Sequence, residues 1–149
     1  MHTQQSRNII VTENLGKSVK TSSGTLHILA DINLQVASGE SIAIAGESGS
    51  GKSTLISLLA GLDTPTIGTI SLNSKSLTSM DEDGRAAMRN QLVGFVFQSF
   101  QLLPALTALE NILLPLELAG RADAHQRAAH WLDRVGLAAR ASHTPRQLS

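Results

Sequence analysis

The sequence predicts an α/β fold, and three observations support that prediction. Within residues 9–36, Ile32, Leu34 and Val36 alternate with polar residues, which is typical of a half-buried strand. A short apolar run at 41–45 is followed by a glycine-rich loop and then by leucines at helical spacing. Beyond residue 98 the apolar spacing is helical throughout. We therefore expect an α/β part followed by a small helical part.

The composition is typical of a globular protein. The 149 residues suffice for one domain with a real core; 42% of them are hydrophobic and 16% charged. Twelve basic residues balance twelve acidic ones, so no net field attracts nucleic acid, which is not expected as a partner. No apolar run approaches the roughly 20 residues that cross a bilayer, so direct membrane insertion is not expected either. The absence of cysteine excludes disulfides and thiolate metal sites.

The expected α/β part begins with strands on either side of a polar turn at 21–24. The run 41–45 suits a buried parallel strand. The helix after the glycine-rich loop should end at Gly61 and Pro65, and residues 68–72 resemble another short strand.

A second helix is expected next. Ser79, with Glu82 three residues later, is a capping-box signal for a helix through about Asn90. Residues 93–97 are strand-like and lead into Gln98.

The helical part contains two further start signals. Thr107 and Glu110 form a capping box, and Pro115 should kink or shorten the helix that follows. One face of that helix carries the apolar residues Leu109, Ile112, Leu113 and Leu116. Asp123 with Gln126 starts a third helix, ended by Gly136. Its inward-facing residues should be Ala128, Leu132 and Val135.

Residues 46–53 fit the phosphate-binding pattern G-x-x-x-x-G-K-[ST]. Its glycines permit backbone angles closed to other residues, so that successive N–H groups can converge on one anion. The helix that begins near Lys52 adds its N-terminal dipole. The Lys52 ammonium can reach the β- and γ-phosphates of a nucleotide, and the Ser53 hydroxyl can bind Mg²⁺. The expected nucleotide-binding residues are Gly46, Glu47, Ser48, Gly49, Ser50, Gly51, Lys52, Ser53 and Thr54.

Other interpretations of the chemistry are weaker. A flexible glycine-serine loop would not need a strand before it and a helix after it, and both are expected here. A GTPase would carry Asp-x-x-Gly after a strand and Asn-Lys-x-Asp later; residues 81–84 match the first pattern only within a helix start, and the second is absent. The five histidines lack metal-ligand spacing.

Besides residues 46–54, three further segments carry a family pattern: 93–98, 102–104 and 107–111. Together these four segments resemble an ABC ATPase. Within that family the resemblance is to the LolD/MacB branch and most of all to YbbA-type subunits. The resemblance covers essentially the whole chain. It implies a P-loop NTPase with an antiparallel β N-terminal part, an incomplete RecA-like core and the start of a helical subdomain.

The resemblance also implies residue roles and a division of the chain. Gln98 would contact Mg²⁺ and the attacking water, so that Gln98 and Lys52 are the catalytic residues and Ser53 and Gln98 the metal-binding ones. Residues 1–98 would form the nucleotide-binding core. Residues 99–149 would form a hinge, facing a membrane permease, and part of the helical subdomain.

The function implied is that of an ATP-binding subunit of a bacterial ABC transporter of exporter or lipoprotein-handling type. Its cofactors would be ATP and Mg²⁺. Its partners would be an integral membrane permease and a second ABC subunit, bound head-to-tail in the full-length protein. Its location would be cytoplasmic, on the inner face of the cytoplasmic membrane. A DNA-repair ATPase shares these motifs, but sustained heptads do not follow Gln98.

The chain departs from the family pattern in two places. The position near Val19, where the family usually has an aromatic residue that stacks on adenine, has none, so weak base selectivity is expected. No apolar strand ends in Asp-Glu, and Leu148-Ser149 resembles only the start of the family signature. The 149 residues alone are therefore expected to bind nucleotide at most; the alternative is a non-catalytic nucleotide-binding fragment or a degenerate ABC protein.

Overall fold

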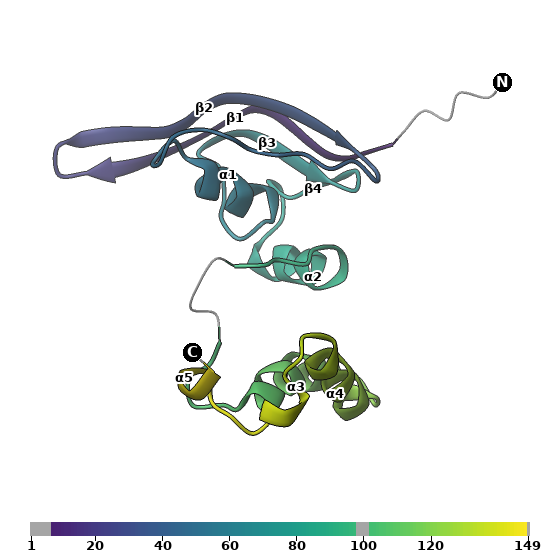
Figure 1. Ribbon diagram of the computed structural model, residues 1–149. Coiled ribbons are helices and arrows are strands. Elements are labelled where there is room, and N and C mark those ends of the chain that lie inside the picture. Colours follow the sequence, from purple (N-terminus) through teal and green to yellow (C-terminus); the bar gives the residue numbers. More distant parts are fainter. Residues whose placement is uncertain (1–6, 98–101, 149) are drawn as a thin grey trace. The chain divides into compact units, whose positions relative to one another are not determined.

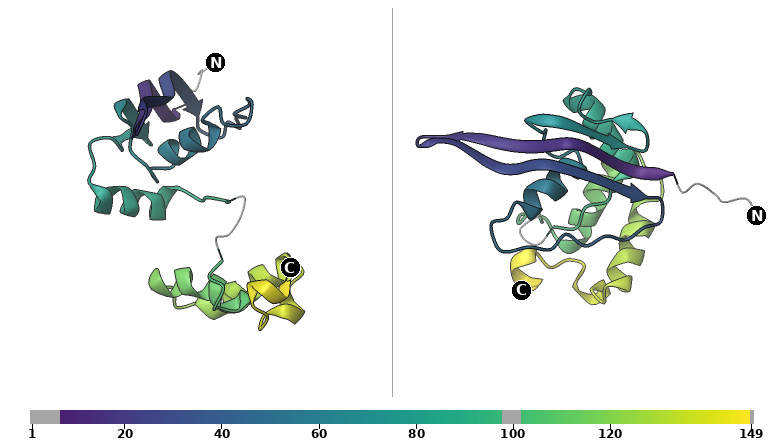
Figure 2. Two further views of the ribbon diagram at one scale, coloured as in Figure 1. Left: turned by 90° about the vertical axis from the view of Figure 1, so that its left-hand side faces the viewer. Right: turned by 90° about the horizontal axis from the view of Figure 1, so that it is seen from above.

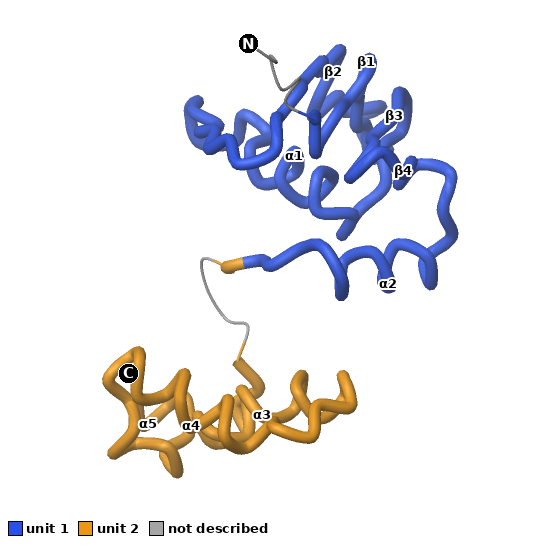
Figure 3. Tube along the Cα trace, turned by 90° about the vertical axis from the view of Figure 1, so that its right-hand side faces the viewer, with its two compact units in different colours: residues 1–95 blue, residues 96–149 orange. Residues whose placement is uncertain are grey.

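The computed structural model describes residues 7–97 and 102–148. These residues form two compact units, 1–95 and 96–149, shown in different colours in Figure 3. The predicted domain boundary after Gln98 falls outside the described residues and stays a prediction.

Unit 1 is built on an antiparallel sheet. Its strands are β1 (Asn8–Thr21), β2 (Gly24–Ala37), β3 (Ile67–Leu72) and β4 (Lys75–Ser76), in the order β2-β1-β3-β4. β1 and β2 form a long hairpin whose turn end extends beyond the rest of the sheet (Figure 2). The two strands predicted on either side of the polar turn at 21–24 are confirmed.

One helix, α1 (Lys52–Leu59), lies against one face of this sheet (Figure 1). It ends where the sequence predicts, because Gly61 adopts a left-handed φ of 69° that other residues disfavour. The Gly61 N–H donates to the Leu58 carbonyl at 3.0 Å, which satisfies one of the last carbonyls of the helix. The hydrophobic core of unit 1 combines residues of the sheet and α1 with Met88 of α2. Its buried members are Leu15, Leu29, Leu55, Leu58, Leu59, Ile70, Leu72, Leu77 and Met88.

The second helix, α2 (Glu82–Leu92), corrects a sequence prediction. Its N-cap is Asp81, whose carboxylate accepts a 2.8 Å hydrogen bond from the Gly84 N–H. The capping box predicted for Ser79 and Glu82 is wrong, because Asp81 lies next to the first turn and caps it. The Ser79 hydroxyl instead donates to the Ser76 carbonyl at 3.2 Å.

Two predicted strands are also absent from the described residues. The runs 41–45 and 93–97 have neither strand nor helix structure, and most of their residues are exposed. A strand needs a hydrogen-bonded neighbour, and neither run pairs with any described strand. The prediction rested on apolar composition. Such a composition shows that a segment can be buried, but it does not show which strand the segment pairs with.

Unit 2 contains α3 (Ala108–Leu118), α4 (Ala124–Arg134), a 3₁₀ turn η1 (Ala138–Arg140) and the short α5 (Pro145–Leu148). The predicted apolar face of α3 is confirmed: Leu113 is buried, and Leu109, Ile112 and Leu116 pack around it with residues of α4. No helix in the described parts of either unit is long and apolar enough to span a bilayer.

The capping box that starts α3 is confirmed. Thr107 accepts from the Glu110 N–H, and Glu110 accepts from the Thr107 N–H at 2.7 Å. Pro115, which was expected to kink or shorten this helix, lies inside it, and the helix continues to Leu118.

The predictions for α4 are partly confirmed. Ala128 and Leu132 are buried, as predicted, and Gly136 ends the helix with a φ of 72°. Val135 is 63% exposed, so its predicted burial is wrong; it is the C-cap, where the chain leaves the helical path. Asp123 precedes the helix without capping it and forms a 2.7 Å ion pair with Arg127 instead.

Candidate phosphate-binding site

The loop 46–51 joins the exposed run 41–45 to α1 and is shaped by its glycines. Gly46, Gly49 and Gly51 have φ values of 156°, 81° and 88°, in a region that residues with a side chain rarely adopt. Gly51 is also tightly packed, because a Cβ there would lie 2.9 Å from the Ile28 carbonyl oxygen. The loop is thus fixed against β2 at its last residue.

The start of α1 presents unpaired donors to the loop. Gly51 is the N-cap and provides no capping side chain, and the first turn carries no acidic residue. The first helical hydrogen bond of α1 joins the Leu55 N–H to the Gly51 carbonyl, at 2.9 Å. The N–H groups of residues 52–54 therefore have no acceptor within the helix, and the positive end of the helix dipole lies at the same place.

Lys52 folds across this loop. Its Nζ donates to the carbonyl oxygens of Gly46, at 2.9 Å, and of Glu47, and lies 3.4 Å from Ser50 Oγ. These acceptors are neutral, and Lys52 forms no ion pair with the part of the chain that the structure describes. Its ammonium can exchange such acceptors for anionic oxygens, to which charge-assisted hydrogen bonds are stronger.

The structure brings the predicted binding residues together on one short segment. The three glycines, Lys52 and the exposed Ser53 all lie at or next to the N-terminus of α1, while Thr54 is half-buried in its first turn. Gln98 lies outside the described residues, so its position relative to the loop stays a prediction.

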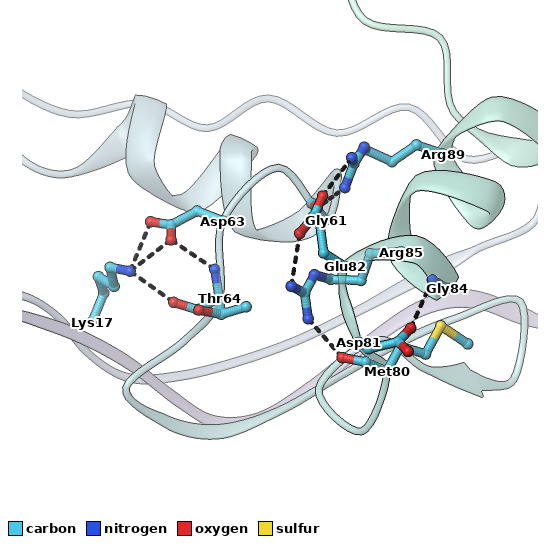
Figure 4. A network of polar contacts seen from close by, with 10 residues as sticks. All are labelled: Lys17, Gly61, Asp63, Thr64, Met80, Asp81, Glu82, Gly84, Arg85 and Arg89. Carbon is cyan, nitrogen blue, oxygen red and sulfur yellow. Dashed lines mark hydrogen bonds and ion pairs between the residues drawn. The ribbon is translucent and has the colours of Figure 1, made fainter.

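A polar network near the other end of α1 was not predicted from the sequence (Figure 4). Lys17 on β1 pairs with Asp63 at 2.8 Å and donates to the Thr64 carbonyl at 2.7 Å. The hydrogen bond from Lys17 lowers the pKa of the Asp63 carboxyl. Arg89 of α2 donates to the Gly61 carbonyl, which lies just past the end of α1.

Glu82 holds the arginines of this network in place. It pairs with Arg85 at 2.7 Å and with Arg89 at 2.8 Å, and hydrogen bonds from Arg89 and then Arg85 lower its pKa. The sequence signal was Glu82 with arginines three and seven residues later, which is helical spacing. Together these contacts attach α2 and β1 to the segment that follows α1.

Comparison with known proteins decides the family. The family model described as "ABC transporter" matches residues 29–149. This chain belongs to the ABC transporter family. The ABC transporter ATP-binding protein YbbA of Escherichia coli (strain K12) is 49% identical over 144 residues, which cover 95% of this chain and 63% of that protein. The lipoprotein-releasing system ATP-binding protein LolD of Legionella pneumophila (strain Lens) is 46% identical over 143 residues, with the same coverage.

Solved structures confirm the fold of this ABC chain. The dimeric ATP-binding cassette MJ0796 in a post-hydrolysis state, bound to ADP and Pi, superposes with a TM-score of 0.87 at 36% identity. The match covers 94% of this chain and 63% of that one. The resemblance to ABC ATPases and the P-loop fold class predicted from the sequence are thus confirmed. The chain spans 63% of the length of the curated relatives named above.

Proposed function

We propose that this chain binds Mg-ATP through residues 46–54 as part of the ATP-binding subunit of an ABC transporter. The observation that carries the proposal is the position of Lys52 Nζ, which lies across a glycine loop at an uncapped helix N-terminus. Such a loop offers backbone N–H groups, a helix dipole and one ammonium to the same group of phosphates.

Each residue type has one role in this proposal. The N–H groups of the loop and of the first turn of α1 bind the phosphate oxygens, and Lys52 leaves the loop carbonyls to contact the β- and γ-phosphates. Mg²⁺ would neutralise phosphate charge when bound, and the Ser53 hydroxyl would supply one of its oxygen ligands. Gln98, which lies outside the described residues, would supply a second ligand and orient water.

The wider activity that we propose is the one that the family membership suggests. ATP hydrolysis would require head-to-tail pairing with a second ABC subunit, and it would drive a membrane permease from the cytoplasmic face of the membrane. The LolD relative is the ATP-binding protein of a lipoprotein-releasing system, and lipoprotein release is therefore one process that such a subunit would serve. The 149-residue polypeptide contains no apolar strand that ends in Asp-Glu, so we expect it to bind ATP with negligible turnover, as a non-catalytic nucleotide-binding fragment would.

Adenine recognition should be weak in this chain. Val19 on β1 is 37% exposed and cannot stack on a base as an aromatic ring does. Stacking of a base on an aromatic side chain is worth about 1–3 kcal/mol in nucleic-acid binders. We therefore expect ATP and GTP to bind with similar affinity, and Val19→Tyr to tighten ATP binding. Equal ATP affinity of the Val19→Tyr chain and the wild type would contradict this assignment.

The test of the proposal is an equilibrium titration with a fluorescent ATP analogue and Mg²⁺. Lys52→Ala removes one charge-assisted contact of about 1.5–3 kcal/mol, so affinity should fall by about 10- to 150-fold. Lys75→Ala, which removes an exposed lysine on β4, is the matched control and should bind as the wild type does. Unchanged affinity in Lys52→Ala, or no binding by the wild type, would refute the proposal.

A further inference from the structure

One side of α4 carries an exposed tryptophan between two arginines. Arg127, Trp131 and Arg134 are spaced i, i+4 and i+7, so they form one stripe along the helix, the α4 stripe. Trp131 is 49% exposed, and the Arg134 guanidinium lies over its ring, 5.6 Å from the ring centre. Tryptophan and arginine are the residue types that most often dominate the binding energy of protein interfaces.

The two arginines of the α4 stripe differ in their partners. Arg127 forms a 2.7 Å ion pair with Asp123, at the start of the same helix. Arg134 forms no ion pair with any residue of 7–97 or 102–148. Stacking on the indole fixes the plane of its guanidinium and leaves the N–H donors at the edge available to a carboxylate. Arg134 is therefore the charge of this stripe that is open to an outside partner.

A stripe of opposite charge with the same spacing lies on α3. Glu110, Leu114 and Glu117 are exposed and are also spaced i, i+4 and i+7; they form the α3 stripe. Glu110 is engaged in the capping box, whereas the charged partner that the described residues give Glu117 is His125, at 3.9 Å. An open cavity of about 330 Å³ lies along this stripe. Its lining residues are Leu106, Glu110, Leu113, Leu114 and Glu117.

The two stripes match when they are placed side by side and parallel. Each spans seven residues, or about 10.5 Å at the helical rise of 1.5 Å per residue. Each arginine then lies opposite a glutamate, and Trp131 lies opposite Leu114, where the indole can cover the cavity. Exposed charge pairs contribute little affinity by themselves, so the indole would supply the affinity and the charges the register. The charge pairs would be Arg127 with Glu110 and Arg134 with Glu117.

Within one molecule the two stripes are not used against each other. α3 and α4 pack through Leu113, Ala124 and Ala128, and in the part of the chain that the structure describes neither arginine of the α4 stripe pairs with a glutamate of the α3 stripe. The matching surfaces thus remain available to a second molecule.

We propose that the α4 stripe of one molecule binds the α3 stripe of a second copy of this chain. The contact joins two different surfaces, so every molecule offers one of each, and assembly can extend beyond two copies. The contact uses no residue of the phosphate loop and therefore goes beyond the function proposed above.

Sedimentation velocity of the 149-residue chain without nucleotide tests this contact. The weight-average mass of the wild type should rise with protein concentration, and the fluorescence of Trp131, the one tryptophan of the sequence, should shift to shorter wavelength in parallel. Arg134→Glu places like charges opposite each other and should raise the concentration at half-association by about tenfold or more. Arg146→Glu, which changes an exposed arginine of α5 outside both stripes, is the matched control and should associate as the wild type does.

Reversal of both charges separates this contact from association by other surfaces. Glu117→Arg alone should weaken association as Arg134→Glu does, and the two substitutions together should restore it, because opposite charges meet again. Circular dichroism checks that each variant is folded. A wild type that stays monomeric at every concentration, equal association of wild type and Arg134→Glu, or no recovery in the double variant would overturn the proposal. Lys52→Ala should associate as the wild type does, which keeps this result apart from the phosphate loop.

Discussion

Gly68 and Gly120 share a positive φ but differ in their surroundings. Gly68, in β3, has a φ of 77°, and a Cβ there would overlap the Asn14 carbonyl oxygen. Gly120, after α3, has a φ of 67°, and a Cβ there would meet nothing within 4 Å. We expect Gly120→Ala to destabilise the chain by about 1–2 kcal/mol through backbone strain alone, and Gly68→Ala by several-fold more. Urea unfolding measures both values; equal losses would contradict the close approach of β1 and β3.

At the scale of single residues, the sequence predicts a role only for residues whose partners lie close to them in the sequence. The three loop glycines and Lys52 lie within seven residues of one another, so their spacing alone indicates a common ligand. The pair of Lys17 and Asp63 could not be predicted in that way. The two residues are separated by 46 positions, and only the packing of β1 beside the segment after α1 brings them together.

At the scale of the elements, two residues are candidates for the N-cap of α2, namely Asp81 and Ser79. Asp81→Ala removes the carboxylate that accepts from the Gly84 N–H, so unfolding free energy should fall by about 1 kcal/mol. Ser79→Ala, at the position that the sequence pattern favoured, should change it by no more than a few tenths. Thermal unfolding of the two variants decides between the caps, and a larger loss in Ser79→Ala would contradict the structure.

The Glu82 contacts of α2 should also make stability depend on pH. Hydrogen bonds from Arg89 and Arg85 lower the pKa of Glu82 below its ordinary value of 4.5. A carboxyl whose pKa is lower in the folded state stabilises the fold fully above the unfolded value, and this contribution is lost as pH falls through the folded value. Asp63, Glu110 and Asp123 shift in the same direction.

Glu82→Gln tests this dependence. As the pH is lowered from about 5 to about 3, the denaturant concentration at the wild-type unfolding midpoint should decrease. The midpoint of the variant should be lower at pH 5 and should decrease less steeply, because the variant has one fewer carboxylate to protonate. Denaturant unfolding across that range gives both curves. Parallel curves for the two chains would show that Glu82 contributes nothing to the acid response.

The elements also show where prediction from sequence ends. Helix ends marked by Gly61, by Gly136 and by the Thr107–Glu110 box are confirmed, because capping depends on residues within a turn of one another. The runs 41–45 and 93–97 were predicted as strands, and the structure does not pair them with any described strand. Strand pairing depends on residues far away in the sequence, which a local pattern does not reveal.

At the scale of the molecule, the runs 41–45 and 93–97 expose apolar side chains among the residues that the structure describes. Within unit 1 an open cavity of about 460 Å³ is lined by Ile42 and Ile44 of one run and by Val93 and Phe95 of the other. Val96, at the start of unit 2, is 96% exposed. Apolar runs exposed in this way favour association between molecules.

Val96→Lys tests whether exposure in such a run governs association. The added charge should raise the protein concentration at which light scattering first detects aggregates, because a lysine in an exposed apolar run opposes edge pairing. Val135→Lys is the matched control, since Val135 is also exposed, at 63%, but lies at the end of α4 outside both runs. An equal effect of the two substitutions would mean that net charge, rather than the run, sets the solubility.

The most direct test of phosphate binding by this chain is the change in backbone amide NMR shifts when Mg-ATP is added. Binding through the loop predicts that the largest shifts fall on residues 46–54, and that they disappear in Lys52→Ala. Shifts spread evenly over both units, or centred on unit 2, would contradict a nucleotide site at the N-terminus of α1.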